Sequence, residues 1–177
     1  RARKTRTRSF NAFSGIDYPE TAVFRDTRLV TFLRRPADQP PVRFYERLEP
    51  AVFVLRLVPG MRADIIPLLA PHYRALVLES FGVGGLPGGE HGEMFAALRR
   101  WCESGRLAVF TTQVPHEGCD LAVYEVGRAV GELPGVLEAR DMTPEAVAVK
   151  LMWALGQTED REKAARLFET PIEYDIM

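Results

Sequence analysis

Short apolar runs and amphipathic stretches alternate along the chain from residue 51 onward. The runs at 51–58, 74–82 and 106–113 are rich in branched and aromatic residues, which favour strands. Between the second and third runs, Met94 and Cys102 fall eight residues apart on one helical face. Strands that alternate with helices over short connections build βαβ units. The sequence therefore predicts an α/β fold, a three-layer domain whose helices flank a short, mainly parallel sheet of about four strands.

The last third of the chain continues this alternation. A fourth, short strand is expected within residues 135–142 and a final helix within 160–168. The clearest helix lies within 141–157, where Thr143 can cap the first turn and Pro144 suits its first helical position.

The first 50 residues follow another pattern. The pattern of residues 21–34 predicts a β-hairpin around a charged turn. The proline-rich stretch that follows has few backbone N–H groups that could form the hydrogen bonds of a β-sheet. We therefore divide the chain into residues 1–35 with a strand and a hairpin, a linker at 36–50, and an α/β domain at 51–177.

Charge and composition argue against several classes of protein. Lys and Arg number 23 against 24 Asp and Glu, which disfavours a nucleic-acid partner and a membrane partner. The basic start, RARKTRTR, is read as a solvated tail in preference to a nucleic-acid arm, or as the middle of a longer protein. The spacing of Cys102 and Cys119 and the scattered histidines predict no metal and no cofactor. We expect a cytoplasmic protein.

Ligands of parallel sheets bind at the carboxyl ends of the strands, which here precede three segments, 59–64, 79–89 and 111–120. The glycines of the second segment match neither a dinucleotide fingerprint nor a phosphate loop. A close-packed flexible loop is the first interpretation; a backbone approach to a small ligand or to a neighbouring subunit is the second. Glu79, at a strand end, is equally suited to contact a ligand or to orient the loop.

Three stretches together resemble the C-terminal half of type I, cytosolic L-asparaginases of the asparaginase-glutaminase family: LVLESFGVGGLP at 76–87, TTQVPHEGCDLAVYEVG at 111–127 and DMTPEAVAVKLMWALGQ at 141–157. The resemblance implies hydrolysis of L-asparagine to L-aspartate and ammonia by a threonine nucleophile of an N-terminal domain. Residues 1–35 would be the end of that domain. The catalytic threonines have no counterpart in these 177 residues, so we expect the isolated chain to be inactive. Alternatives are the asparaginase-like subunit of a tRNA-dependent amidotransferase and a non-catalytic binding domain.

The same resemblance implies roles for individual residues. Lys4, in KTRTRSFNAF, matches the catalytic lysine of the family. Gly84 and Gly85 would belong to a loop at an intersubunit active site, and Tyr124 and Glu125 would contact the substrate, L-asparagine, in a homodimer or homotetramer.

Some positions depart from the family pattern. Gly85 stands where many members carry asparagine. Glu79 and Val114 replace an arginine and a cysteine associated with allosteric asparagine binding, so the resemblance does not extend to that control. If a partner domain is missing, an exposed apolar face is expected around FNAFSG and the hairpin.

Overall fold

A computed structural model describes residues 1–34 and 41–177, and the chain divides into two compact units, Arg1–Glu46 and Arg47–Met177. Residues 36–40 of the expected linker lie outside the described residues. The rest of that linker, 41–50, has no regular secondary structure, and the division between the units falls within it.

The first unit contains two small antiparallel sheets. Strand β1 (Ala2–Lys4) pairs with β2 (Phe13–Gly15), and β3 (Ala22–Arg25) pairs with β4 (Arg28–Thr31). Asp26 turns the second hairpin with φ +54°, a conformation that aspartate tolerates better than most residues. The predicted hairpin is confirmed.

The first unit also exposes aromatic and aliphatic side chains. Phe24 and Leu29 are directly opposite partners in the hairpin, and both are exposed, as are Phe10 and Phe13. The expected apolar face is therefore present on this unit.

The second unit is built on one four-stranded parallel sheet. Its strands are β5 (Val52–Arg56), β6 (Ala75–Ser80), β7 (Leu107–Thr112) and β8 (Val136–Glu138), and their order in the sheet is their order in the chain. All neighbouring strands run parallel. The predicted α/β class, strand number and direction are confirmed.

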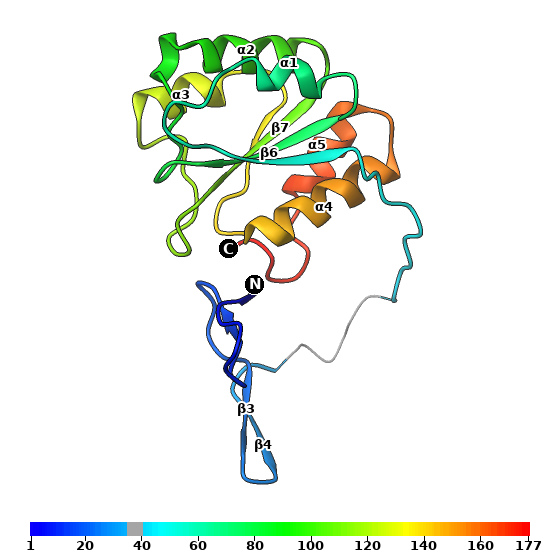
Figure 1. The fold of residues 1–177 in the computed structure, drawn as a ribbon. Coiled ribbons are helices and arrows are strands. Elements are labelled where there is room, and N and C mark those ends of the chain that lie inside the picture. The colour runs from blue at the N-terminus through cyan, green and yellow to red at the C-terminus, as the bar shows by residue number, and fades with distance from the viewer. Residues whose placement is uncertain (35–40) are drawn as a thin grey trace. The chain divides into compact units, whose positions relative to one another are not determined.

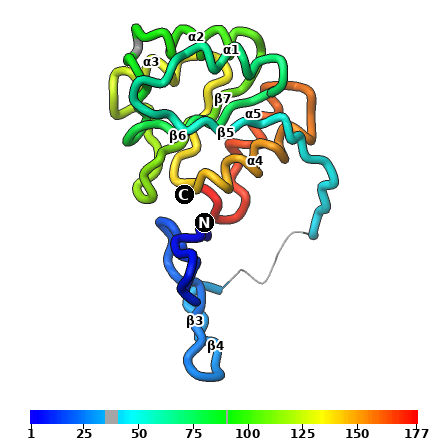
Figure 2. Tube along the Cα trace, viewed as in Figure 1, coloured from blue at the N-terminus to red at the C-terminus, as the bar shows by residue number. Residues whose placement is uncertain are grey.

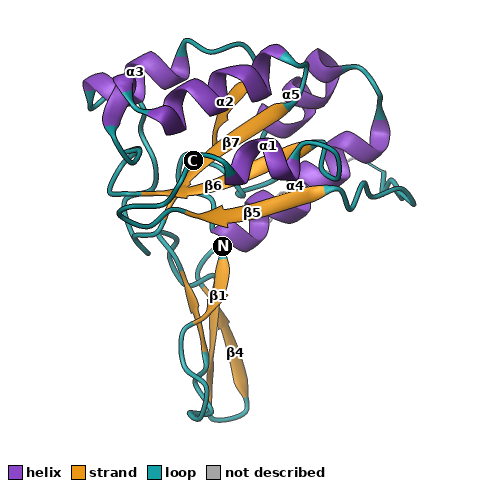
Figure 3. Cartoon of the chain, turned by 45° about the horizontal axis from the view of Figure 1, so that its top comes forward, coloured by secondary structure: helices purple, strands orange, loops and turns teal. Residues whose placement is uncertain are grey.

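Helices cover both faces of this sheet (Figures 1 and 3). The connecting helices are α1 (Ile65–Leu69), α2 (Glu93–Glu103), which follows the short 3-10 helix η1 (Gly89–His91), and α3 (Glu125–Gly131). They lie together on one face, as the trace in Figure 2 shows. Right-handed crossovers that always step in the same direction place every connection on the same side. The other face is left to α4 (Pro144–Gln157) and α5 (Arg161–Glu169).

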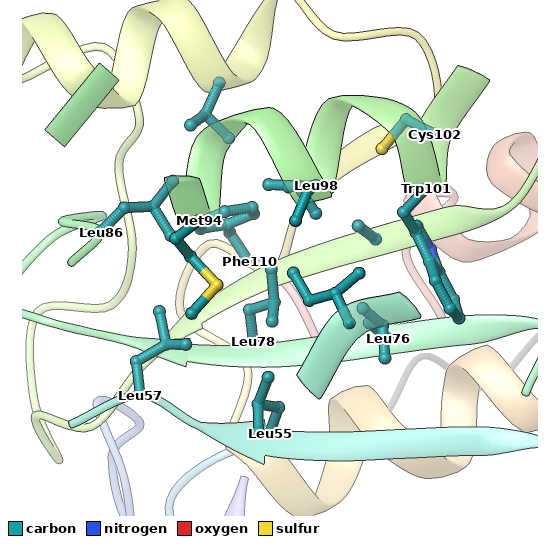
Figure 4. Packing of buried hydrophobic residues seen from close by; sticks show 14 of the residues in the cluster. Leu55, Leu57, Leu76, Leu78, Leu86, Met94, Leu98, Trp101, Cys102 and Phe110 are labelled. Atoms are coloured by element: carbon teal, nitrogen blue, oxygen red, sulfur yellow. The ribbon is translucent and has the colours of Figure 1, made fainter. Parts of the chain in front are cut away.

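The two faces of the sheet have separate apolar cores. On the first, Phe110 of β7 packs near Leu98 and Met94 of α2 (Figure 4). On the second, Val109 packs in a cluster with Leu151 of α4. All six residues of β7 are buried, and its first four, residues 107–110, alternate between these two cores. Each fully buried side chain of this size contributes roughly 1.5–3 kcal/mol of transfer free energy.

Local signals set the helix ends. The Thr143 hydroxyl accepts the Ala146 N–H at 3.4 Å, so the predicted cap of α4 is confirmed. Gly105 follows α2 with φ +88°, which fits a residue just beyond a helix end. These signals fix where each helix stops, and therefore which loops are left at the carboxyl edge of the sheet.

Candidate functional site

The carboxyl ends of β5, β6 and β7 are joined by one side chain, that of Gln113. Its amide nitrogen donates to the carbonyls of Leu57 at 2.6 Å and Glu79 at 2.9 Å. Its amide oxygen accepts a bond from Arg56 Nε at 3.2 Å. Gln113 therefore fixes the register of three strand ends where the candidate site begins.

A second set of bonds holds the loop after β6 to the end of β7. The Thr112 hydroxyl donates to the Gly82 carbonyl and accepts the Val114 N–H at 3.0 Å. The Ser80 hydroxyl donates to the Thr111 carbonyl at 2.8 Å and is fully buried. Ser80 is thus part of the sheet scaffold and is not presented to a substrate.

The glycine-rich loop after β6, here called the glycine loop, packs closely against its own chain. Gly84 is buried with φ +153°, and a Cβ there would lie 2.7 Å from Leu121 Cδ2. The N–H groups of Gly84 and Gly85 both donate to the Phe81 carbonyl, at 3.1 and 2.8 Å. The Asp120 N–H donates to the Val83 carbonyl at 2.9 Å. Within the second unit, the close approach that requires glycine is therefore made to the loop after β7.

Leu121 also connects this loop to α3. A Cβ on Gly127 would lie 2.5 Å from the Leu121 carbonyl oxygen, so α3 lies directly on that backbone. Tyr124 and Glu125 begin α3, and both side chains are exposed. The structure thus brings Tyr124 and Glu125 into the neighbourhood of Gly84 through Leu121, with their side chains open to solvent.

Lys4 belongs to the first unit. It is the last residue of β1 and pairs with Phe13 of β2. Its side chain is exposed, and within the described parts of the chain its ammonium group has no ion-pair partner. The group is therefore free to engage a carboxylate or a hydroxyl brought to it.

A cleft of about 570 Å³ opens between the loop after β5 and the glycine loop. The residues that line this cleft include Gly60, Arg62, Phe81, Glu93 and Met94. Arg62 is paired with Asp64 at 2.6 Å, and both are well exposed. The lining mixes apolar and charged groups, so the cleft can take a polar ligand or a side chain of a neighbouring protein surface.

Sequence reasoning did not single out Glu138, at the end of β8. Its carboxylate accepts the Leu121 N–H at 3.1 Å, and burial raises the pKa of this carboxyl. Beside it, burial raises the pKa of the Cys119 thiol to about 12. That thiol stays protonated at neutral pH and is no nucleophile. The only signal in the sequence was the position of Glu138 at a strand end.

Other candidates have plain structural roles. Glu79 Oε2 lies 3.8 Å from Arg56 Nε, and its side chain is 13 % exposed, so it helps to hold two strand ends. In the described ranges, no cluster of three histidine, cysteine or acidic residues could hold a metal ion. No helix in those ranges is long and apolar enough to cross a membrane.

The chain is similar to known proteins along nearly its whole length. Residues 51–168 match the family model of the Glutaminase/Asparaginase C-terminal domain. The L-asparaginase of Thermococcus kodakarensis is 37 % identical over 99 % of this chain and 53 % of its own length. Its solved structure superimposes with a TM-score of 0.85, at 33 % identity over 100 % of this chain and 53 % of the other.

A second named function also occurs among the relatives. A glutamyl-tRNA(Gln) amidotransferase subunit of Metallosphaera sedula is 35 % identical over 96 % of this chain and 38 % of its own length. The structure of L-asparaginase I from Vibrio cholerae gives a TM-score of 0.84 at 25 % identity, covering all of this chain and 53 % of that one. The chain spans about half the length of these asparaginases. The chain belongs to the glutaminase/asparaginase family, and residues 51–168 correspond to the family's C-terminal domain.

Proposed function

We propose that the complete protein carrying this chain hydrolyses L-asparagine to L-aspartate and ammonia. The observation that carries the proposal is the 37 % identity with the L-asparaginase of Thermococcus kodakarensis along 99 % of the chain. Similarity of that extent includes both units, and so includes the segment that contains Lys4 as well as the loops of the carboxyl edge.

Lys4 is proposed to handle a proton at the reaction centre. Hydrolysis through a threonine ester needs an activated hydroxyl, because a free hydroxyl is a weak nucleophile. A lysine held beside a carboxylate can exchange a proton with such a hydroxyl. The exposed Lys4 ammonium at the end of β1 is available for this pairing. The threonines themselves are expected in the part of the protein outside this chain.

Tyr124 and Glu125 are proposed to contact the substrate from the carboxyl edge. Both are exposed at the start of α3, and Glu125 offers a carboxylate for the α-ammonium group of asparagine. Gly84 and Gly85 would support this edge by packing, where the pocket of a neighbouring subunit is completed. The assembly would be a homodimer or homotetramer.

The exposed apolar face of the first unit fits the same proposal. The remainder of the complete protein would pack against the exposed side chains of Phe10, Phe13, Phe24 and Leu29. The chain would then consist of the end of an N-terminal domain (1–35), a linker (36–50) and the C-terminal domain (51–177). A cytoplasmic location stays a prediction.

A second candidate is a subunit of a tRNA-dependent amidotransferase, which the 35 % identity with the Metallosphaera sedula protein favours. The two functions differ in where ammonia goes. An asparaginase releases ammonia from asparagine with no other macromolecule present. An amidotransferase subunit delivers it to a partner, so free ammonia should rise only weakly without that partner and its tRNA.

The test is ammonia release from L-asparagine by the complete protein and by three variants. Lys4→Ala should abolish turnover, and Glu125→Gln should lower kcat/KM by about tenfold or more without unfolding, because it removes one charged contact. Glu132→Gln, at the other end of the same helix, is the matched control and should behave as wild type. An unchanged kcat/KM for Glu125→Gln would remove that residue from the site.

The 177-residue chain alone should release no ammonia, since none of its segments resembles the threonine motifs of the reaction. Ammonia release by this chain that Lys4→Ala abolishes would contradict the expected division of roles. The proposal for the complete protein is tested separately by its own turnover.

A further inference from the structure

A second cavity, of about 330 Å³, lies at the opposite edge of the sheet. It is formed by the turns that lead into β6 and β7 and by the connection between α4 and α5. We call it the amino-edge cavity. Because parallel strands all begin there, it is a different site from the loops at the carboxyl edge. Its volume falls at the lower end of small-molecule sites, roughly 300–1,000 Å³.

The lining of the amino-edge cavity is rich in positive charge. Three guanidinium groups, from Arg74, Arg106 and Arg161, face a single lining carboxylate, that of Glu159. Arg74 is already neutralised, because Glu159 lies 2.7 Å from its Nη2 and Glu49 lies 3.0 Å from its Nη1. The charges of the other two arginines decide what the cavity can bind.

Arg106 is held in one orientation by neutral groups. Its Nε and Nη2 donate to the carbonyls of Tyr73 at 3.2 Å and Ala70 at 2.7 Å, and its Nη1 donates to the Ser104 hydroxyl at 2.6 Å. The guanidinium also lies 5.2 Å from the centre of the Trp101 ring. Across the described ranges it has no carboxylate within ion-pair distance. Its position is therefore fixed while its charge stays uncompensated.

Arg161 is still less engaged. Among the described residues, its one hydrogen bond runs from Nη1 to the Cys102 carbonyl, at 3.3 Å, and no carboxylate pairs with it. The neighbouring Asp160 turns its carboxylate to the Lys163 N–H, at 3.0 Å, where it caps α5. Most of the planar donor fork of Arg161 is thus left for another acceptor.

We propose that the amino-edge cavity binds a small anion that carries a phosphate or a carboxylate group, held chiefly by Arg106 and Arg161. Guanidinium forks match both groups in geometry, and a partly enclosed site strengthens such bonds. Pre-orientation of Arg106 lowers the entropy lost on binding. Glu159, whose side chain is 88 % exposed at the cavity, competes with the anion for the same positive charge.

Titration calorimetry on the chain tests this, with inorganic phosphate and succinate as separate probes in a buffer free of both. At least one probe should bind with a dissociation constant below about 1 mM, and the probe that binds better identifies the anion class. Arg161→Gln should weaken that binding by about tenfold or more, because it removes charged hydrogen bonds. Glu159→Gln should strengthen it several-fold, since it removes the competing carboxylate.

Arg166→Gln is the matched control. It makes the same substitution on the same helix, but Arg166 pairs with Glu162 at 3.8 Å and does not line the cavity. Its affinity should stay within about twofold of wild type. The proposal is overturned if neither probe binds at about 10 mM, if Arg161→Gln leaves binding unchanged, or if Arg166→Gln weakens it equally. None of these readouts depends on hydrolysis of asparagine.

Discussion

The ion pair between Lys150 and Asp175 should hold the C-terminal segment on the second unit. Lys150 Nζ lies 2.6 Å from Asp175 Oδ2, and the two side chains are 5 % and 20 % exposed. The same ammonium donates to the Thr170 carbonyl at 2.8 Å and lies 5.7 Å from the centre of the Phe168 ring. These three partners of the Lys150 charge therefore belong to α5 or to the segment after it.

Removing either partner leaves the other charge poorly solvated. Asp175→Asn should cost about 3 kcal/mol of unfolding free energy, because the remaining ammonium is almost fully buried. Lys150→Met should cost about 2 kcal/mol, less because Asp175 can still reach water and keeps its bond from the Ile172 N–H at 2.7 Å. The double variant should cost less than the sum, with a coupling of about 1.5–2.5 kcal/mol.

Urea denaturation at neutral pH, followed by circular dichroism, measures all four proteins of this cycle. The exposed pair Arg99–Glu103 of α2, 4.0 Å apart, is the matched control, and its coupling should be near 0.3 kcal/mol, in the range of about 0–0.5. If the Lys150–Asp175 coupling were no larger than that of the control pair, burial would not strengthen this interaction and the reasoning would be refuted.

Three further predictions test the carboxyl edge. Gly84→Ala should lower the unfolding free energy by about 2 kcal/mol or more, because Gly84 has a positive φ and a Cβ there would clash with Leu121. In Gly85→Ala the new Cβ meets its nearest atom at 3.3 Å, so this variant should cost under about 1 kcal/mol. Equal losses of unfolding free energy in the two variants would contradict this reasoning. Thr112→Val should cost about 1–2 kcal/mol of unfolding free energy and Thr112→Ser much less, since only valine loses both hydroxyl bonds. Chemical denaturation measures both variants. Equal losses of unfolding free energy would show that packing, and not the hydroxyl group, stabilises this position. Burial raises the folded-state pKa of Glu138, so its contribution to stability is present below the unfolded pKa and is lost as pH rises through the folded one. Glu138→Gln keeps an acceptor for the Leu121 N–H, and its stability relative to wild type should increase from about pH 4 to about pH 7; a constant difference would show that the carboxyl does not titrate differently on folding.

Structural elements that depend on local sequence signals were predicted well. The cap at Thr143 and the proline after it act over a few residues, and the local sequence predicts both. The buried face of α2, including Leu98 and Cys102, follows from spacing alone. The expected order of strands and helices was confirmed for the same reason.

Features that depend on distant residues were not predicted. The bond from Gln113 to Leu57 spans 56 residues, and no local pattern indicates it. The contact between Gly84 and Leu121 is likewise set by how two loops meet above the sheet. Glu138 shows the same limit, because the N–H group that its carboxylate accepts belongs to Leu121, 17 residues away. The sequence predicted which loops follow the carboxyl ends of the strands but not the bonds that shape them.

The hydrogen bonds of the glycine loop also limit what it can do in the proposed reaction. An oxyanion is stabilised by N–H groups that point at it and have no other acceptor. The N–H groups of Gly84 and Gly85 both donate to the Phe81 carbonyl, so neither of these two groups is available to an oxyanion while the loop keeps its present form. In the proposed reaction, the carboxyl edge would then act through side chains that project from it. Tyr124 and Glu125, exposed at the start of α3, meet that requirement, and the oxyanion donors are expected from another part of the complete protein.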